Sequence, residues 1–349
     1  MSGPDAPLLT VDGLTVRLPT HDGVVHAVTD LSYEVRPGET LGIVGESGSG
    51  KTVSALAVLG LHDRQARVSG SVRVAGTEVV GAPERTLRRL RGNEVAMVFQ
   101  DSLSSLHPYF PVGRQIAEAH LAHHHVSRAA ARARAVAMLD RVGIAQASRR
   151  ADDFPHQLSG GMRQRAMIAM ALVNDPKVVV ADEPTTALDV TVQAQILDLL
   201  RDLQQEAGSA VVLITHDLGV VAETADRMLV MYGGRAVESG PARDVLADPK
   251  MPYTWGLLSS MPDLDADAAT PLTPIEGTPP SLLDPPDGCP FQPRCPHAHL
   301  VAGDRCRTEL PPLVPAGSGH HLSRCHLSDP GAVRDRGRDP GADREAPGG

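Results

Sequence analysis

Short, almost wholly apolar runs alternate with amphipathic segments over much of this 349-residue chain. Four runs have the composition of strands that are buried on both faces of a parallel sheet: residues 40–44, 94–99, 177–181 and 210–215. Between the last two, apolar side chains recur at helical spacing, namely Val192, Ile196, Leu199, Leu200 and Leu203. This alternation of strands and helices predicts a layered α/β core.

The segments around this core have different patterns. Residues 8–11, 14–18 and 26–35 read as strands that are broken at 19–23, and 71–74 and 78–80 read as two short strands, so we expect an antiparallel β subdomain. A basic helix is expected at 84–90. Residues 102–157 are helical and loop-like, with Ser127 positioned to cap a helix over 128–142, which predicts a helical insertion. Residues 227–232 and 235–238 predict a closing hairpin.

The first buried run leads directly into residues 45–52, which read GESGSGKT. A strand, a glycine-rich turn and a helix N-terminus together form a cradle of backbone N–H groups for phosphate oxygens. Lys51 can reach the β- and γ-phosphates, and the Thr52 hydroxyl can bind Mg²⁺. The residues expected to contact the nucleotide are Gly45, Ser47, Gly48, Ser49, Gly50, Lys51 and Thr52.

Composition adds limits on where the protein acts. The net charge is −9, with 33 Lys and Arg against 42 Asp and Glu, which argues against a protein that wraps nucleic acid. No apolar run approaches the roughly 18 residues of a membrane span, and the first residues lack the features of a signal peptide. We therefore expect a cytosolic chain that reaches a membrane only by docking onto other subunits. Residues 329–349 contain almost no apolar side chains and are expected to be disordered.

Two carboxylates, Asp182 and Glu183, end the apolar run at 178–181. Asp182 is placed to hold Mg²⁺ through a water molecule, and Glu183 is placed to accept the proton of an attacking water. Upstream, residues 158–164 read LSGGMRQ, and their helix N-terminus at Ser159, Gly160 and Gly161 predicts a surface that faces an anion. The carboxylate pair alone also fits a structural strand end, but the companion motifs favour catalysis.

The order of these motifs resembles that of the nucleotide-binding subunits of ABC transporters, across roughly residues 8–248. The matching motifs are Walker A at 45–52, the Q-loop at Gln100, the signature at 158–164, Walker B at 178–183, the D-loop at 187–189 and the switch histidine at His216. The resemblance implies an ABC-type P-loop NTPase core. It also implies a head-to-tail pair of such domains, with each ATP held between the Walker A of one and the signature helix of the other.

The resemblance also assigns roles to single residues. Glu183 is expected to be the catalytic base, and His216 to contact the γ-phosphate. Gln100 would couple Mg²⁺ occupancy to the helical insertion, which grips the transmembrane partners. The expected Mg²⁺ ligands are Thr52, Gln100 and Asp182, and Asp189 is a further nucleotide contact. This family usually stacks an aromatic side chain on adenine, but residues 18–28 contain none, which leaves His21 and His26 as candidates.

Residues 252–258 (PYTWGLL) and 288–296 (GCPFQPRCP) resemble the C-terminal extension of oligopeptide and dipeptide importer ATPases, a group that includes nickel importer subunits. The resemblance implies a peripheral subunit on the cytoplasmic face of the membrane that hydrolyses ATP to power peptide import. Its partners would be a second ATPase subunit, two permease subunits and an extracellular peptide-binding protein. Nickel import is the alternative within this family. A soluble ABC ATPase that acts on ribosomes or DNA is disfavoured, because the chain has one nucleotide domain and lacks a long coiled-coil insertion. A purely regulatory metal-binding protein would not need Glu183.

All the cysteines lie in this C-terminal region, at Cys289, Cys295, Cys306 and Cys325. In a reducing cytosol, four clustered thiols more often bind metal than form disulfides. Their spacing lacks the paired C-x-x-C knuckles of common zinc sites, while four thiolates suit a 4Fe-4S cluster, which related importer ATPases carry here. Zinc and unligated thiols remain alternatives. The expected domains are 1–248, with an insertion at about 102–157, and 249–328. Because the cysteines and the ATP motifs lie in different segments, we expect the two sites to be independent.

Overall fold

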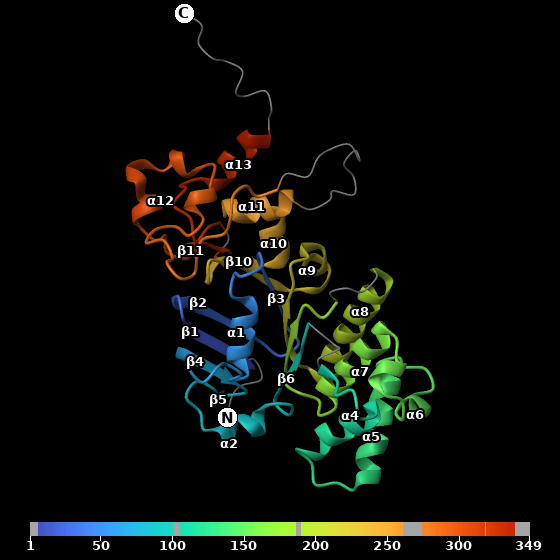
Figure 1. Ribbon diagram of the computed structural model, residues 1–349. Coiled ribbons are helices and arrows are strands. Elements are labelled where there is room, and N and C mark those ends of the chain that lie inside the picture. The colour runs from blue at the N-terminus through green and yellow to red at the C-terminus, as the bar shows by residue number, and fades with distance from the viewer. Residues whose placement is uncertain (1–5, 101–104, 186–189, 261–273, 318, 339–349) are drawn as a thin grey trace, which may run out of the picture.

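The computed structural model describes residues 6–100, 105–185, 190–260, 274–317 and 319–338 (Figure 1). Within these ranges an eight-stranded sheet forms the centre, in the order β11-β12-β10-β9-β3-β8-β7-β6. Its strands are β3 (Thr40–Val44), β6 (Val95–Val98), β7 (Val178–Asp182), β8 (Ala210–Ile214), β9 (Arg227–Tyr232), β10 (Arg235–Pro241), β11 (Val314–Pro315) and β12 (Leu322–Ser323). Strands β6, β7, β8, β3 and β9 pair in parallel, and the other three add antiparallel pairs.

The parallel strands are covered on both faces, as their apolar composition predicts. In β8, Val212 and Ile214 pack into a cluster that includes the antiparallel subdomain and α1 (Lys51–Val58). Val211 and Leu213 pack into a second cluster with α7 (Gly160–Leu172) and α8 (Val190–Ala207). Successive side chains of a strand point to opposite faces, so α1 and α7 lie on opposite faces of the sheet (Figure 1).

The antiparallel subdomain is a four-stranded sheet in the order β2-β1-β4-β5. Its strands are β1 (Leu9–Thr20), β2 (Gly23–Val35), β4 (Arg67–Val74) and β5 (Thr77–Glu78). The expected break at 19–23 is therefore too long, because β1 continues through Pro19. The ladder between β1 and β4 ends at Arg17, so Pro19 lies where one edge of the strand has no partner and its missing N–H costs nothing.

The helical insertion forms a separate lobe beside α7 (Figure 1). It contains α4 (Val112–Leu121), α5 (Arg128–Arg141), α6 (Ala147–Arg150) and the 3₁₀ turn η1 (Pro155–Gln157). The predicted cap is present, since Ser127 Oγ accepts a hydrogen bond from the Ala130 N–H at 3.2 Å. The buried face of α5 includes Ala135 and Leu139, which pack on α4 and α7.

The other helices flank the core or build the C-terminal region. They are α2 (Glu84–Leu90), α9 (Leu218–Thr224), α10 (Ala242–Ala247), α11 (Pro252–Ser259), α12 (Arg305–Thr308), α13 (Pro330–Arg338) and the 3₁₀ turns η2 (Gln292–Arg294), η3 (Ala298–Leu300) and η4 (Ala302–Asp304). Helix α2 matches its predicted bounds. Among the residues in the described ranges, no helix combines the length and apolar character that crossing a bilayer requires.

The C-terminal region continues the central sheet, because β12 pairs with β10 through Glu238 opposite Ser323. The boundary predicted at residue 248 stays a prediction, and strands from both sides of it belong to one sheet. The expectation of disorder from residue 329 is wrong for α13. Asp329 Oδ1 accepts a hydrogen bond from the Ala332 N–H and Pro330 is the first helical residue, so strong start signals outweigh the polar composition. Residues 339–349 lie outside the described ranges.

A buried polar contact anchors this region to the core. The Glu238 side chain on β10 is fully buried and lies 2.7 Å from His321 Nε2, measured to Oε1. Its other carboxylate oxygen accepts a hydrogen bond from the Met251 N–H at 3.2 Å. Removing a hydrogen-bond partner of a buried carboxylate destabilises the folded protein, because water cannot reach the carboxylate to replace the lost hydrogen bond.

The His321→Ala variant should therefore lower the free energy of unfolding by roughly 2–3 kcal/mol, the cost of losing a buried hydrogen bond to a charged group. Denaturant titration of the purified chain measures this change. Arg305→Ala is the matched control, because the Arg305–Glu309 pair is exposed and should contribute less than about 0.5 kcal/mol. Equal losses in the two variants would show that the Glu238–His321 contact is not an anchor.

Candidate functional site

The phosphate loop lies between β3 and α1, as predicted. Its glycines adopt backbone conformations that other residues avoid, with φ of 152° at Gly45 and 101° at Gly50. A Cβ at Gly45 would lie 2.2 Å from the Met231 carbonyl oxygen, and one at Gly50 would lie 2.3 Å from the Ala27 carbonyl oxygen. Only glycine lets the loop approach β9 and β2 this closely.

Lys51 is buried and reaches back across the loop. Its Nζ donates hydrogen bonds to the carbonyl oxygens of Gly45 at 2.7 Å and Glu46 at 2.9 Å. Burial lowers the pKa of the Lys51 ammonium, and nearby carboxylates, led by that of Glu183, oppose the shift. The cation is therefore held between the loop and the acidic end of β7, where a phosphate group would meet it.

Thr52 and Asp182, two of the predicted Mg²⁺ ligands, are in contact. The Thr52 hydroxyl hydrogen-bonds to the Asp182 carboxylate at the end of β7. Burial raises the pKa of Asp182, and the hydrogen bond from Thr52 acts in the opposite direction. Together with the amide oxygen of Gln100, these are hard oxygen donors, the ligand type that Mg²⁺ prefers.

Glu183 lies at the centre of the three predicted catalytic residues. Gln100 Nε2 donates a hydrogen bond to Glu183 Oε2 at 2.8 Å, and His216 Nδ1 lies 3.2 Å from Oε1. These residues follow β6, β7 and β8, which are adjacent parallel strands, so their carboxyl ends meet at one edge of the sheet. The structure thus brings together the residues that the sequence predicts.

The signature residues are not near the phosphate loop of the same chain. Ser159 caps α7, with its Oγ accepting a hydrogen bond from the Met162 N–H at 3.3 Å. Ser159 and Gly160 are exposed, and open space surrounds the position of a Cβ at Gly160. Gly161 is half-buried against Val192. Since α7 and α1 lie on opposite faces of the sheet, this helix N-terminus faces away from the chain's own Lys51.

Two further predictions concern the adenine and the D-loop. His21 is exposed at the turn between β1 and β2, and His26 is half-buried on β2. The His26 N–H donates a hydrogen bond to the Leu282 carbonyl oxygen at 2.8 Å, so the C-terminal region packs on this hairpin. Either histidine as the adenine contact stays a prediction. Asp189 lies outside the described residues.

Sequence reasoning missed the contacts of Glu46, the second residue of the phosphate loop. Its carboxylate forms a two-bonded ion pair with Arg294, at 2.6 Å to Nη1 and 3.1 Å to Nη2. Its N–H donates a hydrogen bond to the Tyr253 hydroxyl at 2.8 Å. Arg294 directly precedes Cys295, so the cysteine region and the phosphate loop are in contact, while the independence of the two sites stays a prediction. No local sequence signal marks a contact between residues 248 positions apart.

The four cysteines lie in one apolar cluster around Tyr232, Tyr253 and Phe291, and all are free thiols. Burial raises the pKa of Cys295 to about 11 and those of Cys289 and Cys325 to about 12, and it also raises the pKa of Cys306. Thiolates at Cys289 and Cys325 would also be repelled by the neighbouring sulfurs. In the parts of the chain that the structure covers, no three His, Cys, Asp or Glu side chains are arranged to hold a single metal ion.

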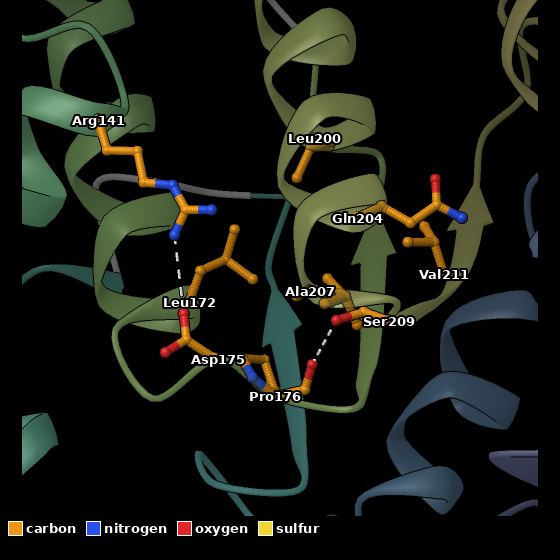
Figure 2. A pocket seen from close by; sticks show the side chains of 10 residues that line it. Arg141, Leu172, Asp175, Pro176, Leu200, Gln204, Ala207, Ser209 and Val211 are labelled. Atoms are coloured by element: carbon orange, nitrogen blue, oxygen red, sulfur yellow. Dashed lines mark hydrogen bonds and ion pairs between the residues drawn. The ribbon is translucent and has the colours of Figure 1, made fainter. Parts of the chain in front are cut away.

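A small pocket at the other end of the sheet is separate from this site (Figure 2). Asp175 and Pro176 precede β7 and Ser209 precedes β8, whereas Glu183 and His216 follow these strands. Ser209 Oγ donates a hydrogen bond to the Pro176 carbonyl oxygen at 2.6 Å, which closes one side of the pocket. Its volume of about 20 Å³ is enough for a water molecule and too small for a nucleotide.

The nucleotide-binding core and the C-terminal region of the chain each match a known protein family. Residues 28–186 match the family model described as ABC transporter, and residues 237–300 match the one described as oligopeptide/dipeptide transporter, C-terminal region. The oligopeptide transport ATP-binding proteins OppD of Salmonella typhimurium and Escherichia coli are each 53% identical over 306 residues. The match covers 88% of this chain and 90% and 89% of those proteins, respectively.

The OppD protein of Mycobacterium tuberculosis is 53% identical over 319 residues, which cover 91% of this chain and 52% of that protein. The chain thus spans about half the length of this relative. Among solved structures, a dimeric ATP-binding cassette in a post-hydrolysis state with ADP and Pi is similar. It has a TM-score of 0.61 and 27% identity, over 67% of this chain and 99% of that one. Part of an ABC transporter complex from Clostridium perfringens gives a TM-score of 0.59 and 28% identity, over 69% of this chain and 91% of that one.

Proposed function

This chain belongs to the family of oligopeptide transport ATP-binding proteins of ABC transporters, and we propose that it hydrolyses ATP to power the import of short peptides across a membrane. The observation that carries the proposal is a combination of three features. The chain has a phosphate loop, a Glu183 carboxylate in contact with Gln100 and His216, and a C-terminal region of the peptide-importer type. No single feature would distinguish peptide import from other uses of ATP.

In the proposed reaction, Glu183 accepts a proton from the water that attacks the γ-phosphate. A bound Mg²⁺ would neutralise charge on the phosphates, with Thr52, Asp182 and Gln100 as its holding residues. In the present structure, Gln100 and His216 both contact Glu183. On binding of ATP, these two side chains would turn from Glu183 toward the metal and the γ-phosphate, so that the Glu183 carboxylate can accept a hydrogen bond from the attacking water.

The exposed signature helix supports a second ATPase subunit as partner. One chain supplies a phosphate loop on one face of its sheet and a signature N-terminus on the other, so it cannot complete a site alone. A head-to-tail pair would complete two sites, and the similar cassette of known structure is dimeric. We propose a heterodimer, and Asp189 as a further nucleotide contact stays a prediction.

An apolar groove of about 550 Å³ supports docking onto membrane permeases. It lies between the core and the helical insertion and is lined by side chains such as Phe99, Met97, Met167 and Met170. Phe99 is 39% exposed and adjoins the other apolar side chains of this groove, and a contiguous apolar surface is typical of an interaction site. Because Phe99 directly precedes Gln100, a helix of the permease in this groove would contact the segment that leads to the ATP site. We propose that the chain works with two permease subunits and an extracellular peptide-binding protein. We also propose that it lies on the cytoplasmic face of the membrane.

We also propose that the four cysteines hold a 4Fe-4S cluster. What supports the proposal is that all four thiols belong to one apolar cluster of the described structure and that four thiolates are the usual ligand set of a 4Fe-4S cluster. Arg324 is buried beside Cys289 and supplies positive charge for an anionic cluster. Bound there, the cluster would join three segments of the C-terminal region.

Replacement of Cys295 by serine should remove most of the iron and the visible absorption band of protein purified without oxygen. The physical reason is that a serine hydroxyl is a poor substitute for a thiolate ligand to iron. His326→Ala is the control, because the His326 ring makes a hydrogen bond to the Glu309 carbonyl oxygen and is not expected to bind iron. Unchanged iron content in Cys295→Ser would exclude this cysteine as a ligand.

The cargo is tested by ATP turnover of the complex purified from its own host and reconstituted in lipid with its binding protein. Stimulation by peptides of two to eight residues would support peptide import. Stimulation by nickel alone would place the chain among the metal importers of the same family. In that case the ATP chemistry at Glu183 would stand and the peptide cargo would be wrong.

A further inference from the structure

The guanidinium of Arg294 occupies a fully built site between the C-terminal region and the phosphate loop. Its side chain is 4% exposed, and all five of its N–H groups have acceptors. Two bind the Glu46 carboxylate, and the other three donate to the Tyr232 hydroxyl and the carbonyl oxygens of Ile275 and Glu276. A group held by so many fixed contacts cannot shift easily.

On the other side of the pair, three polar groups of Glu46 are each fixed by a different residue. The carboxylate binds Arg294, the N–H binds the Tyr253 hydroxyl and the carbonyl oxygen accepts from Lys51. Two of these three partners lie in the C-terminal region. The conformation at the start of the phosphate loop is thus set partly from outside the nucleotide-binding core.

The negative charge of the Glu46 carboxylate affects the binding of ATP. Glu46 is one of the carboxylates whose charge is felt by the Lys51 ammonium, so it lies close to where phosphates bind. A negative charge at that place repels the phosphates of ATP unless a cation balances it. Among the described residues, the cation that pairs with the Glu46 carboxylate is Arg294, whereas Lys51 contacts the Glu46 carbonyl oxygen.

We propose that Arg294 is a positioning residue for ATP, which neutralises and holds the Glu46 carboxylate so that the phosphate loop accepts the nucleotide's negative charge. The C-terminal region of the chain therefore contributes to nucleotide affinity as well as to assembly. This inference rests on the proposed function only in that ATP is the ligand, because it concerns binding and not transport or hydrolysis.

The test is the Kd of a fluorescent ATP analogue for the full-length chain, measured directly and without turnover. Arg294→Met should raise the Kd about tenfold, because it leaves one unpaired charge near the phosphates. Glu46→Gln, in contrast, should leave the Kd unchanged or lower, since it removes the repelling charge. The double variant should return the Kd to within about threefold of the unaltered chain, as expected for a directly coupled pair.

Arg305→Met is the matched control, because Arg305 lies in the same region but pairs with Glu309 on the surface. It should leave the Kd unchanged. A purely structural role of Arg294 would weaken binding in Arg294→Met and in Glu46→Gln alike, without recovery in the double variant, and would overturn the proposal. So would an unchanged Kd in Arg294→Met. Failure of peptide or nickel to stimulate hydrolysis would count against the proposed function and leave this result standing.

Discussion

Replacing Glu183 with glutamine is expected to slow ATP hydrolysis by about 10²–10⁴-fold, the usual contribution of a general base, while ATP stays bound. Glutamine has nearly the same shape and can still contact Gln100 and His216 at the ends of β6 and β8. It has no basic oxygen to accept the proton of water. Turnover and nucleotide binding, both measured on the reconstituted complex, separate the two effects.

Glu309→Gln is the control for this change, because the Glu309 side chain is exposed on the C-terminal region and pairs with Arg305. Its turnover should equal that of the unaltered complex. Near-normal turnover in Glu183→Gln would remove Glu183 from the role of base and would direct attention to Asp182, the other carboxylate at this strand end.

The second large effect is expected from Gly50→Ala, which should abolish detectable ATP binding. The added Cβ would lie 2.3 Å from the Ala27 carbonyl oxygen on β2, closer than real Cβ atoms approach, at a φ of 101°. Either the loop or the strand has to move, and Lys51 follows Gly50 directly. The binding assay with the fluorescent ATP analogue and denaturant unfolding measure the loss of affinity and of stability.

Gly76→Ala separates backbone strain from this collision. Gly76 also has a positive φ, 82°, but no heavy atom lies within 4 Å of the position of its Cβ. The Gly76→Ala variant should lower the free energy of unfolding by roughly 1–2 kcal/mol, because a left-handed backbone conformation costs a non-glycine residue about that much. Its ATP affinity should not change. If Gly50→Ala behaved in the same way, the close approach of the loop to β2 would not be essential to the site.

The core elements were predictable because their signals are local. Buried parallel strands require unbroken apolar runs, so β3, β6, β7 and β8 lie within a residue of their predicted bounds. The cap at Ser127 depends only on residues three positions apart. Errors occurred where a neighbouring strand decided the outcome, as at Pro19, which β1 tolerates because β4 does not extend alongside it.

The sequence by itself determined the phosphate loop, the strand-end carboxylates and the type of fold, since each depends on residue types at short, fixed spacing. Only the tertiary structure decided that β12 joins the central sheet and that Arg294 binds Glu46. Among 33 Lys and Arg and 42 Asp and Glu residues, nothing local marks which two will meet across 248 positions. Such pairs are selected by the packing of distant segments, which in this protein brings the four-cysteine region against the ATP site.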